Sequence, residues 1–201
     1  MLAIIEAAGW PIWPIIAASI IALGIIGERS WSLRRNLVAP RDLLSRVTEE
    51  FRTQGVSQAM LDRLAQDSVL GRIFAAGLAN VKNTREVTKE AIEEAGRAAA
   101  HELDRFLPPL GTIASLSPIM GLLGTVIGMI EIFGSQAPGG NSPAQLAHGI
   151  SVALYNTAFG LIVAIPSMIF YRHFRSHADS LVVEMEQQAV KLVEILHGER
   201  H

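Results

Sequence analysis

The chain has 201 residues, of which 50% are hydrophobic and 18% charged, and its formal net charge is −2 at pH 7. This near-neutral balance gives no sign of the net basic surface that nucleic-acid binding needs. The chain has no cysteine, which excludes disulfides, Cys-based metal sites and thiol nucleophiles. Its apolar residues are concentrated in long uncharged blocks, so the sequence indicates a membrane protein.

The first uncharged block covers residues 7–27 and lies between Glu6 and Glu28. It resembles a secretory signal only superficially, because no Lys or Arg precedes it, it is longer than a typical signal core, and Arg29 follows it closely. We therefore expect residues 1–27 to form an N-terminal segment and a first transmembrane helix that is retained as an anchor.

Residues 28–106 have the spacing of a helical domain. The apolar positions predict helices over residues 28–51, 60–64, 69–81 and 84–106. Asn83 and Glu86 match a capping box at the start of the last of these helices. Within it, Glu93 and Arg97 have the spacing of an i,i+4 ion pair.

The second half of the chain contains two further predicted spans, residues 107–131 and 150–171, each long enough to cross a hydrocarbon core of roughly 30 Å. The connection between them, residues 132–149, is rich in Gly, Pro, Ser and Asn and is expected to be a loop. Residues 172–201 follow with near-heptad apolar spacing, which predicts a helix that packs on another helix.

Both of these spans have a face of small residues. On the first, the face consists of Ser117, Gly121, Thr125 and Gly128; on the second, of Ala153, Thr157, Gly160 and Ala164. Small residues let helix backbones approach in lipid, and Gly124 with Gly128 forms a GxxxG step. The simpler interpretation is close packing. The functional interpretation is that Ser117, Thr125, Asn156 and Thr157 line a wetted or partner-filled seam.

Neither span has an Asp, Glu, Lys, Arg or His in its interior. Hydroxyls relay a proton but do not hold one at physiological pH, so ion transport would need a titrating group from another subunit. Glu131 ends the second predicted span and is either a membrane-boundary charge or a group at an ion path. His173 and His177 share a helix face, but without a third ligand nearby they fit contacts with lipid headgroups better than a metal site.

Charge placement predicts the orientation. Every Lys and Arg falls within residues 28–106 or 172–201. By the positive-inside rule these segments form a cytoplasmic helical domain, while the N-terminus and the loop 132–149 face outward. The chain has no phosphate-binding loop, zinc-protease motif or serine nucleophile elbow, so we expect neither an enzyme nor a bound cofactor. The expected fold is an all-α membrane protein with three transmembrane helices.

The residues Pro118 to Met129 and Ala153 to Pro166 resemble the ExbB/TolQ/MotA proton-channel family, and the ExbB and TolQ branch most closely. The resemblance extends over nearly the whole chain. It implies a homopentameric ring in the bacterial inner membrane around the transmembrane helices of a small ExbD- or TolR-like partner. In that family an aspartate of the partner takes and releases protons, and Thr125 and Thr157 match the two pore threonines.

Such a complex uses the proton-motive force for energy transduction to TonB- or Tol-like transport and envelope work, through a TonB- or TolA-like protein. One departure is Val152, a position at which many ExbB and TolQ relatives have an acidic residue. The resemblance therefore leaves the hydroxyl seam and the partner's aspartate to carry the proton. The alternative is a non-conducting membrane scaffold that holds the small partner, because no charge occurs inside the spans. A secondary transporter fits less well, because the chain shows no inverted repeat.

Overall fold

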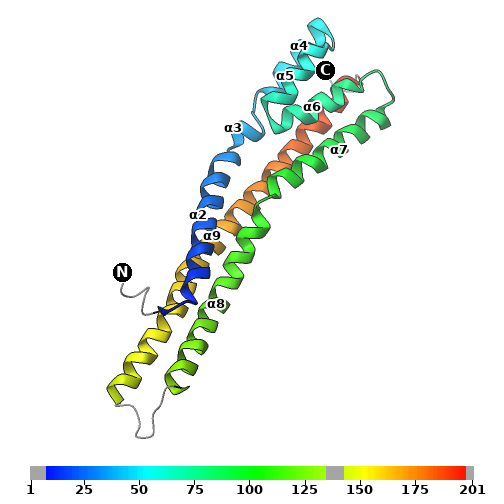
Figure 1. Ribbon diagram of the computed structural model, residues 1–201. Coiled ribbons are helices and arrows are strands. Elements are labelled where there is room, and N and C mark those ends of the chain that lie inside the picture. The colour runs from blue at the N-terminus through cyan, green and yellow to red at the C-terminus, as the bar shows by residue number, and fades with distance from the viewer. Residues whose placement is uncertain (1–7, 135–142, 198–201) are drawn as a thin grey trace. The chain divides into compact units, whose positions relative to one another are not determined.

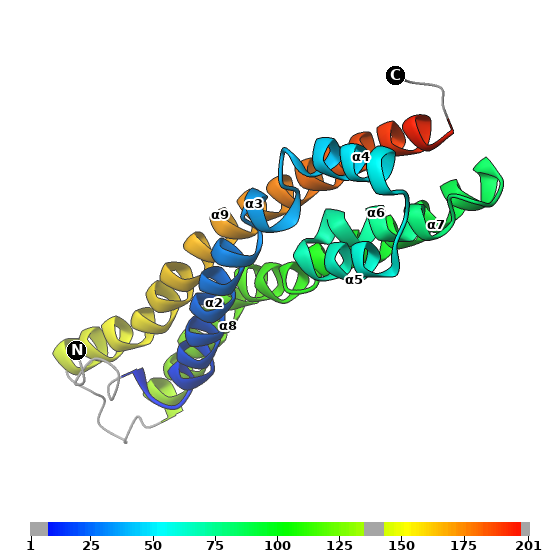
Figure 2. The same cartoon turned by 90° about the horizontal axis from the view of Figure 1, so that it is seen from above.

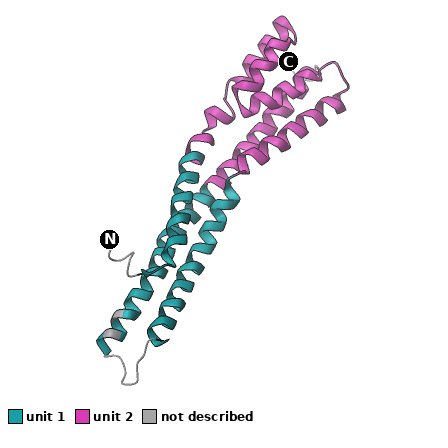
Figure 3. Ribbon diagram, in the orientation of Figure 1, with its two compact units in different colours: residues 1–28, 106–173 teal, residues 29–105, 174–201 magenta. Residues whose placement is uncertain are grey.

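The computed structural model describes residues 8–134 and 143–197, and the regular structure of these residues is entirely helical. The helices are α2 (Ile12–Ser32), α3 (Arg35–Val38), α4 (Leu43–Gln54), α5 (Gln58–Asp67), α6 (Val69–Ala79), α7 (Arg85–Asp104), α8 (Leu107–Gly134) and α9 (Pro143–Leu196). The predicted all-α fold is confirmed. The chain forms two compact units, residues 1–28 with 106–173 and residues 29–105 with 174–201 (Figure 3).

In the first unit α2, α8 and the first part of α9 lie side by side (Figures 1 and 2). Three helical stretches are long and apolar enough to cross a membrane: Ile12–Ser32, Arg85–Gly134 and Gly149–Leu196. Large apolar side chains on all three helices are exposed, among them Ile20, Ile119 and Ile162 at 61 to 66%. Since a surface of this kind is not stable in water, lipid or protein must cover it. The predicted three membrane helices are confirmed.

The ends of the last two apolar helices lie beyond the predicted spans. α8 continues to Gly134, and α9 begins at Pro143, inside the segment expected as a loop. Proline is well suited to the first turn of a helix, where its missing N–H has no partner in any case. α9 then runs without interruption from the third predicted span into the C-terminal segment.

The second unit has its core around α6. Leu70, Phe74 and Leu78 of this helix are fully buried. α6 packs on α5 and α7, and a Cβ at Gly77 would lie 2.6 Å from Ile92 of α7 and 3.7 Å from Leu192 of α9. The near-heptad stripe on α9 therefore packs on other helices, as predicted.

Two local predictions for this unit were wrong. The helix expected over 28–51 is divided into α2, α3 and α4. The break between α3 and α4 follows from Pro40, which lacks an N–H and disfavours helical backbone at Ala39, whose φ is −139° and ψ 78°. The capping box is also absent. Thr84 is the N-cap of α7 without a side-chain hydrogen bond, and Asn83 Nδ2 instead donates to Asn80 Oδ1.

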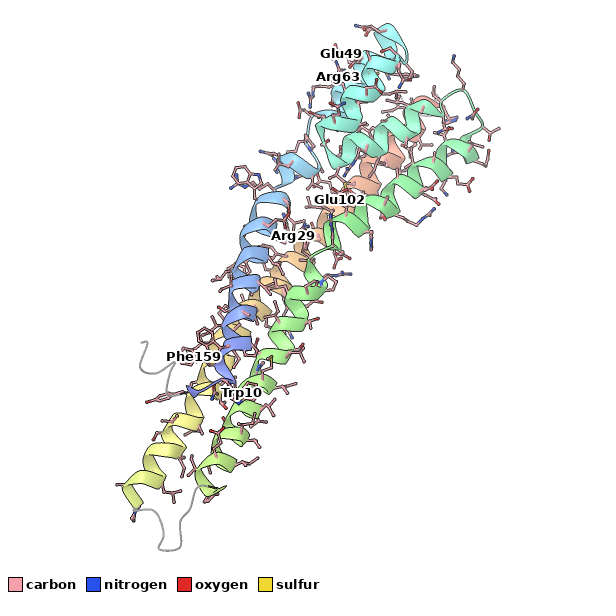
Figure 4. The ribbon with its side chains drawn as sticks, in the orientation of Figure 1. Trp10, Arg29, Glu49, Arg63, Glu102 and Phe159 are labelled. Atoms are coloured by element: carbon pink, nitrogen blue, oxygen red, sulfur yellow. The ribbon has the colours of Figure 1, made fainter. Side chains whose placement is uncertain are left out.

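Ion pairs connect the helices of the second unit. Arg35 pairs with Glu184, Arg63 with Glu50, Arg72 with Glu102 and Arg175 with Asp104 (Arg63 and Glu102 are labelled in Figure 4). The predicted pair between Glu93 and Arg97 is confirmed at 4.0 Å, and Lys89 lies 3.5 Å from the same carboxylate. All these groups are partly exposed, so each pair contributes at most about 1 kcal/mol.

Candidate functional site

α8 and α9 approach each other closely along their faces of small residues. At Gly160 a Cβ atom would lie 2.5 Å from the Ser117 carbonyl oxygen, and at Gly121 one would lie 2.7 Å from the Asn156 carbonyl oxygen. Real Cβ atoms essentially never come within 3.0 Å of another heavy atom. Both contacts are with backbone, which cannot turn away as a side chain can. Only glycine fits these two positions.

The same contact continues toward the end of α8. A Cβ at Gly124 would meet the Asn156 side chain at 2.7 Å, and one at Gly128 would meet the Ala153 Cβ at 3.1 Å. Ala153 is 2% exposed. The two helices are therefore packed backbone to backbone over about two turns, the distance from Gly121 to Gly128.

Thr125 and Thr157 meet inside this contact. Their Oγ1 atoms are 2.5 Å apart, although the residues come from different helices. Thr125 Oγ1 also lies 3.1 Å from the Ala153 carbonyl oxygen, and both hydroxyls lie 3.2 Å from the Gly121 carbonyl oxygen. The glycine contact brings the helices close enough for this pair to form.

The threonine pair has more acceptors than protons. Two hydroxyls supply two O–H donors, while the two carbonyl oxygens and the hydroxyls themselves all accept. At any moment one hydroxyl donates to the other, which donates to a carbonyl, or both donate to carbonyls. These arrangements interconvert by rotation of the hydroxyls alone. The pair can thus change the direction of its hydrogen bonds without a movement of the backbone.

Ser117 does not join the threonine pair. Its side chain is 1% exposed, and its hydroxyl donates to the Ile113 carbonyl oxygen of its own helix at 2.7 Å. Serine in a helix interior commonly makes this bond to the residue four positions earlier. The contribution of Ser117 to the contact is its backbone, against which Gly160 packs.

Asn156 is also separate from the threonine pair. It is 2% exposed, and its Nδ2 donates to the Ala8 carbonyl oxygen at 2.9 Å. It lines a pocket of about 490 Å³ between α8, α9 and residues 8–11, to which neither threonine contributes. Sequence reasoning missed this pocket, because no local pattern places residues 8–11 against two helices that come more than a hundred residues later.

Glu131 is the one residue with a formal charge between positions 107 and 171. It is exposed near the end of α8 and lines the same pocket. The threonine pair therefore lies in a stretch of helix without Asp, Glu, Lys, Arg or His, and it can hand on a proton but cannot store one.

Three helices long and apolar enough to cross a membrane define a multi-pass α-helical membrane protein. Two of them are joined by a glycine-lined contact, and the hydroxyl pair inside this contact is suited to relaying protons. The sequence model of the MotA/TolQ/ExbB proton channel family matches residues 65–187, which include α8, most of α9 and the threonine pair.

Individual relatives agree with this match. The Tol-Pal system protein TolQ of Pseudomonas aeruginosa is 31% identical over 93% of this chain and 86% of its own length. A biopolymer transport protein of the ExbB-like type from Synechocystis is 31% identical over 81% of this chain and 79% of its own length. The biopolymer transport protein exbB1 of Vibrio cholerae is 27% identical over 87% of this chain and 78% of its own length.

The chain belongs to the MotA/TolQ/ExbB proton channel family. This is a family of proton channels that energise transport, not a family of enzymes.

Proposed function

We propose that this chain is the channel subunit of a proton-driven stator in the bacterial inner membrane. It surrounds, as a homopentamer, the transmembrane helices of a single-span ExbD- or TolR-like partner. Together they use the proton-motive force to energise TonB- or Tol-like work through a TonB- or TolA-like protein. The relatives are named for the Tol-Pal system and for biopolymer transport, which supports work of one of these two kinds.

The observation that carries the proposal is the threonine pair. Thr125 and Thr157 offer a hydroxyl relay in the packed contact between two apolar helices, and the relay itself contains no Asp, Glu, Lys, Arg or His that could hold the proton. A relay without a titrating group is useful only next to one supplied by another chain. The partner's intramembrane aspartate is a group of this kind.

The distribution of charge supports the orientation. All Lys and Arg residues lie in the second unit or directly at its border, at positions 29–105 and 172–200. The second unit is therefore cytoplasmic, and the N-terminus and the α8–α9 connection face the periplasm. In this orientation the exposed apolar side chains of the first unit contact membrane lipids, neighbouring subunits and the partner's helix.

The test is proton flux in vesicles that contain this chain and its partner. Thr157→Val removes one hydroxyl at nearly constant volume, and we expect it to abolish the flux while the complex still assembles. Thr125→Val should do the same. Thr112→Val is the matched control, because Thr112 is exposed and its hydroxyl donates to the Pro108 carbonyl oxygen of its own helix. A wild-type flux in Thr157→Val would remove the pair from the mechanism.

Co-purification with the partner, followed by native mass determination, separates a channel from a scaffold. A ring that retains the partner and conducts protons only when the partner has its aspartate supports the proposal. A ring that retains the partner but conducts nothing under a potential supports the non-conducting scaffold instead.

A further inference from the structure

The pocket beside the threonine pair has an internal polar group with an unsatisfied oxygen. Asn156 lines it from α9, and Nδ2 of this residue donates to the Ala8 carbonyl oxygen, which fixes the amide so that Oδ1 is the other atom. Oδ1 is buried and has no hydrogen-bond partner among the described residues. Buried amide oxygens in native proteins are nearly always paired, with protein or with ordered water. The pocket is therefore expected to hold a donor or a cation at this end.

Glu131 gives the pocket its charge. It lines the pocket from α8, and it is the one ionisable residue among the lining residues. Val152 lines the pocket from α9 and is uncharged. No salt bridge neutralises Glu131 within residues 8–134 and 143–197. A carboxylate and an amide oxygen attract cations and water, and they repel anions.

The size and depth of the pocket suit small hydrated cations. Its volume of about 490 Å³ holds on the order of ten water molecules. Gly149 lines it near the start of α9 and Asn156 lines it further along. The seven-residue step from Gly149 to Asn156 spans roughly 10 Å of helix. The pocket thus reaches the level of Thr157, the residue next to Asn156.

We propose that this pocket is a hydrated access site for the coupling cation, hydronium or Na⁺. Glu131 raises the local concentration of the cation, and Asn156 lines the inner end of the pocket. The inference rests on the proposed function and adds to it a carboxylate of this subunit, which lies on α8 and not on α9. The rim residue Trp10 is labelled in Figure 4.

The first test measures the pocket itself and needs no flux. Because the chain has no native cysteine, Val152→Cys introduces a single thiol into the pocket. In the assembled complex, a cationic methanethiosulfonate reagent added from the periplasmic side should modify it at least about 10-fold faster than an anionic one. Adding Glu131→Gln should remove most of that preference. Ile162→Cys, on an exposed apolar face outside the pocket, is the control.

The second test measures flux. Glu131→Gln should lower it by about 10-fold, while Glu131→Asp keeps most of it. The double variant Glu131→Gln with Val152→Glu should recover flux, because it returns a carboxylate to the same pocket from the facing helix. Glu94→Gln removes one exposed carboxylate of α7 and should have no effect. Flux that persists when choline replaces Na⁺ identifies hydronium, and flux that follows the Na⁺ concentration identifies Na⁺; both results support the access site.

The outcomes separate this inference from the proposed function. A thiol at position 152 that does not react, together with full flux in Glu131→Gln, overturns the access site and leaves the channel intact; the pocket is then filled by lipid or by a neighbouring subunit. A thiol with the expected charge preference in a complex that conducts no ion supports a cation-binding pocket and overturns the channel.

Discussion

Gly160→Ala tests the closeness of α8 and α9. The new Cβ would lie 2.5 Å from the Ser117 carbonyl oxygen and 3.2 Å from the Gly121 Cα. Both are backbone atoms, so relief to an ordinary contact of 3.4 Å requires the helices to separate by about 0.9 Å. Overpacking of a well-packed contact typically costs 1–3 kcal/mol, and a contact with rigid backbone belongs at the upper end, about 3 kcal/mol.

The assay is thermal unfolding of the purified protein in detergent, followed by circular dichroism. The control is Gly24→Ala, because nothing lies within 4 Å of a Cβ at Gly24 and the helix gains about 0.5–1 kcal/mol from alanine. We expect the midpoint to fall in Gly160→Ala and to rise slightly in the control. Equal midpoints in the two variants would refute the close approach of the helices.

The same substitution has a consequence for the threonine pair. A separation of about 0.9 Å is enough to lengthen the 2.5 Å contact between the two Oγ1 atoms beyond the range of a good O–H···O bond. Proton flux in Gly160→Ala should therefore fall even in protein that is still folded and assembled.

Three further predictions concern caps, ion pairs and the helix contact. Ser68→Ala should destabilise the second unit by about 1 kcal/mol, because Ser68 Oγ accepts a hydrogen bond from Gly71 N at 3.0 Å. Thr84→Ala is the control and should change the stability little, because Thr84 makes no side-chain cap. The measurement is the thermal unfolding midpoint of each variant. A double-mutant cycle on Arg35 and Glu184 should give a coupling free energy of no more than about 1 kcal/mol, because the two side chains remain 38% and 25% exposed. A much larger coupling free energy would mean that the pair is buried in the assembly. Gly128→Cys with Ala153→Cys should form a disulfide on oxidation, because the Cβ positions are 3.1 Å apart and a shift of about 0.4 Å brings them into the disulfide range. Flux should survive the cross-link; loss of flux on oxidation, restored by reduction, would show that α8 and α9 must move.

The sequence predicted the features that a membrane requires. Apolar length and the spacing of small residues located the spans and the contact between them, because lipid permits few alternatives. Thr125 and Thr157 were grouped correctly, since both belong to faces with helical spacing. Asn156 was grouped with them on chemistry alone. A residue next to Thr157 points about 100° away around the helix, which is why the structure finds it in the pocket.

Other features depended on long-range contacts or on local competition. The pocket needs residues 8–11 against α8 and α9, a contact that no periodicity encodes. Ser117 was expected to face the seam, but its hydroxyl bonds to its own helix. The break between α3 and α4 follows from Pro40 and was predictable, because proline disfavours helical backbone at the residue before it.

The packing of α8 on α9 indicates which part of the proposed complex moves. Ideal Cβ positions at Gly121 and Gly160 fall within 3 Å of backbone on the facing helix, so the helices cannot slide past each other without first separating. The hydroxyl pair, by contrast, reorients without any movement of backbone. The contact between α8 and α9 is therefore suited to remain fixed while protons pass, and in the proposed complex we expect the motion that performs work to belong to the partner.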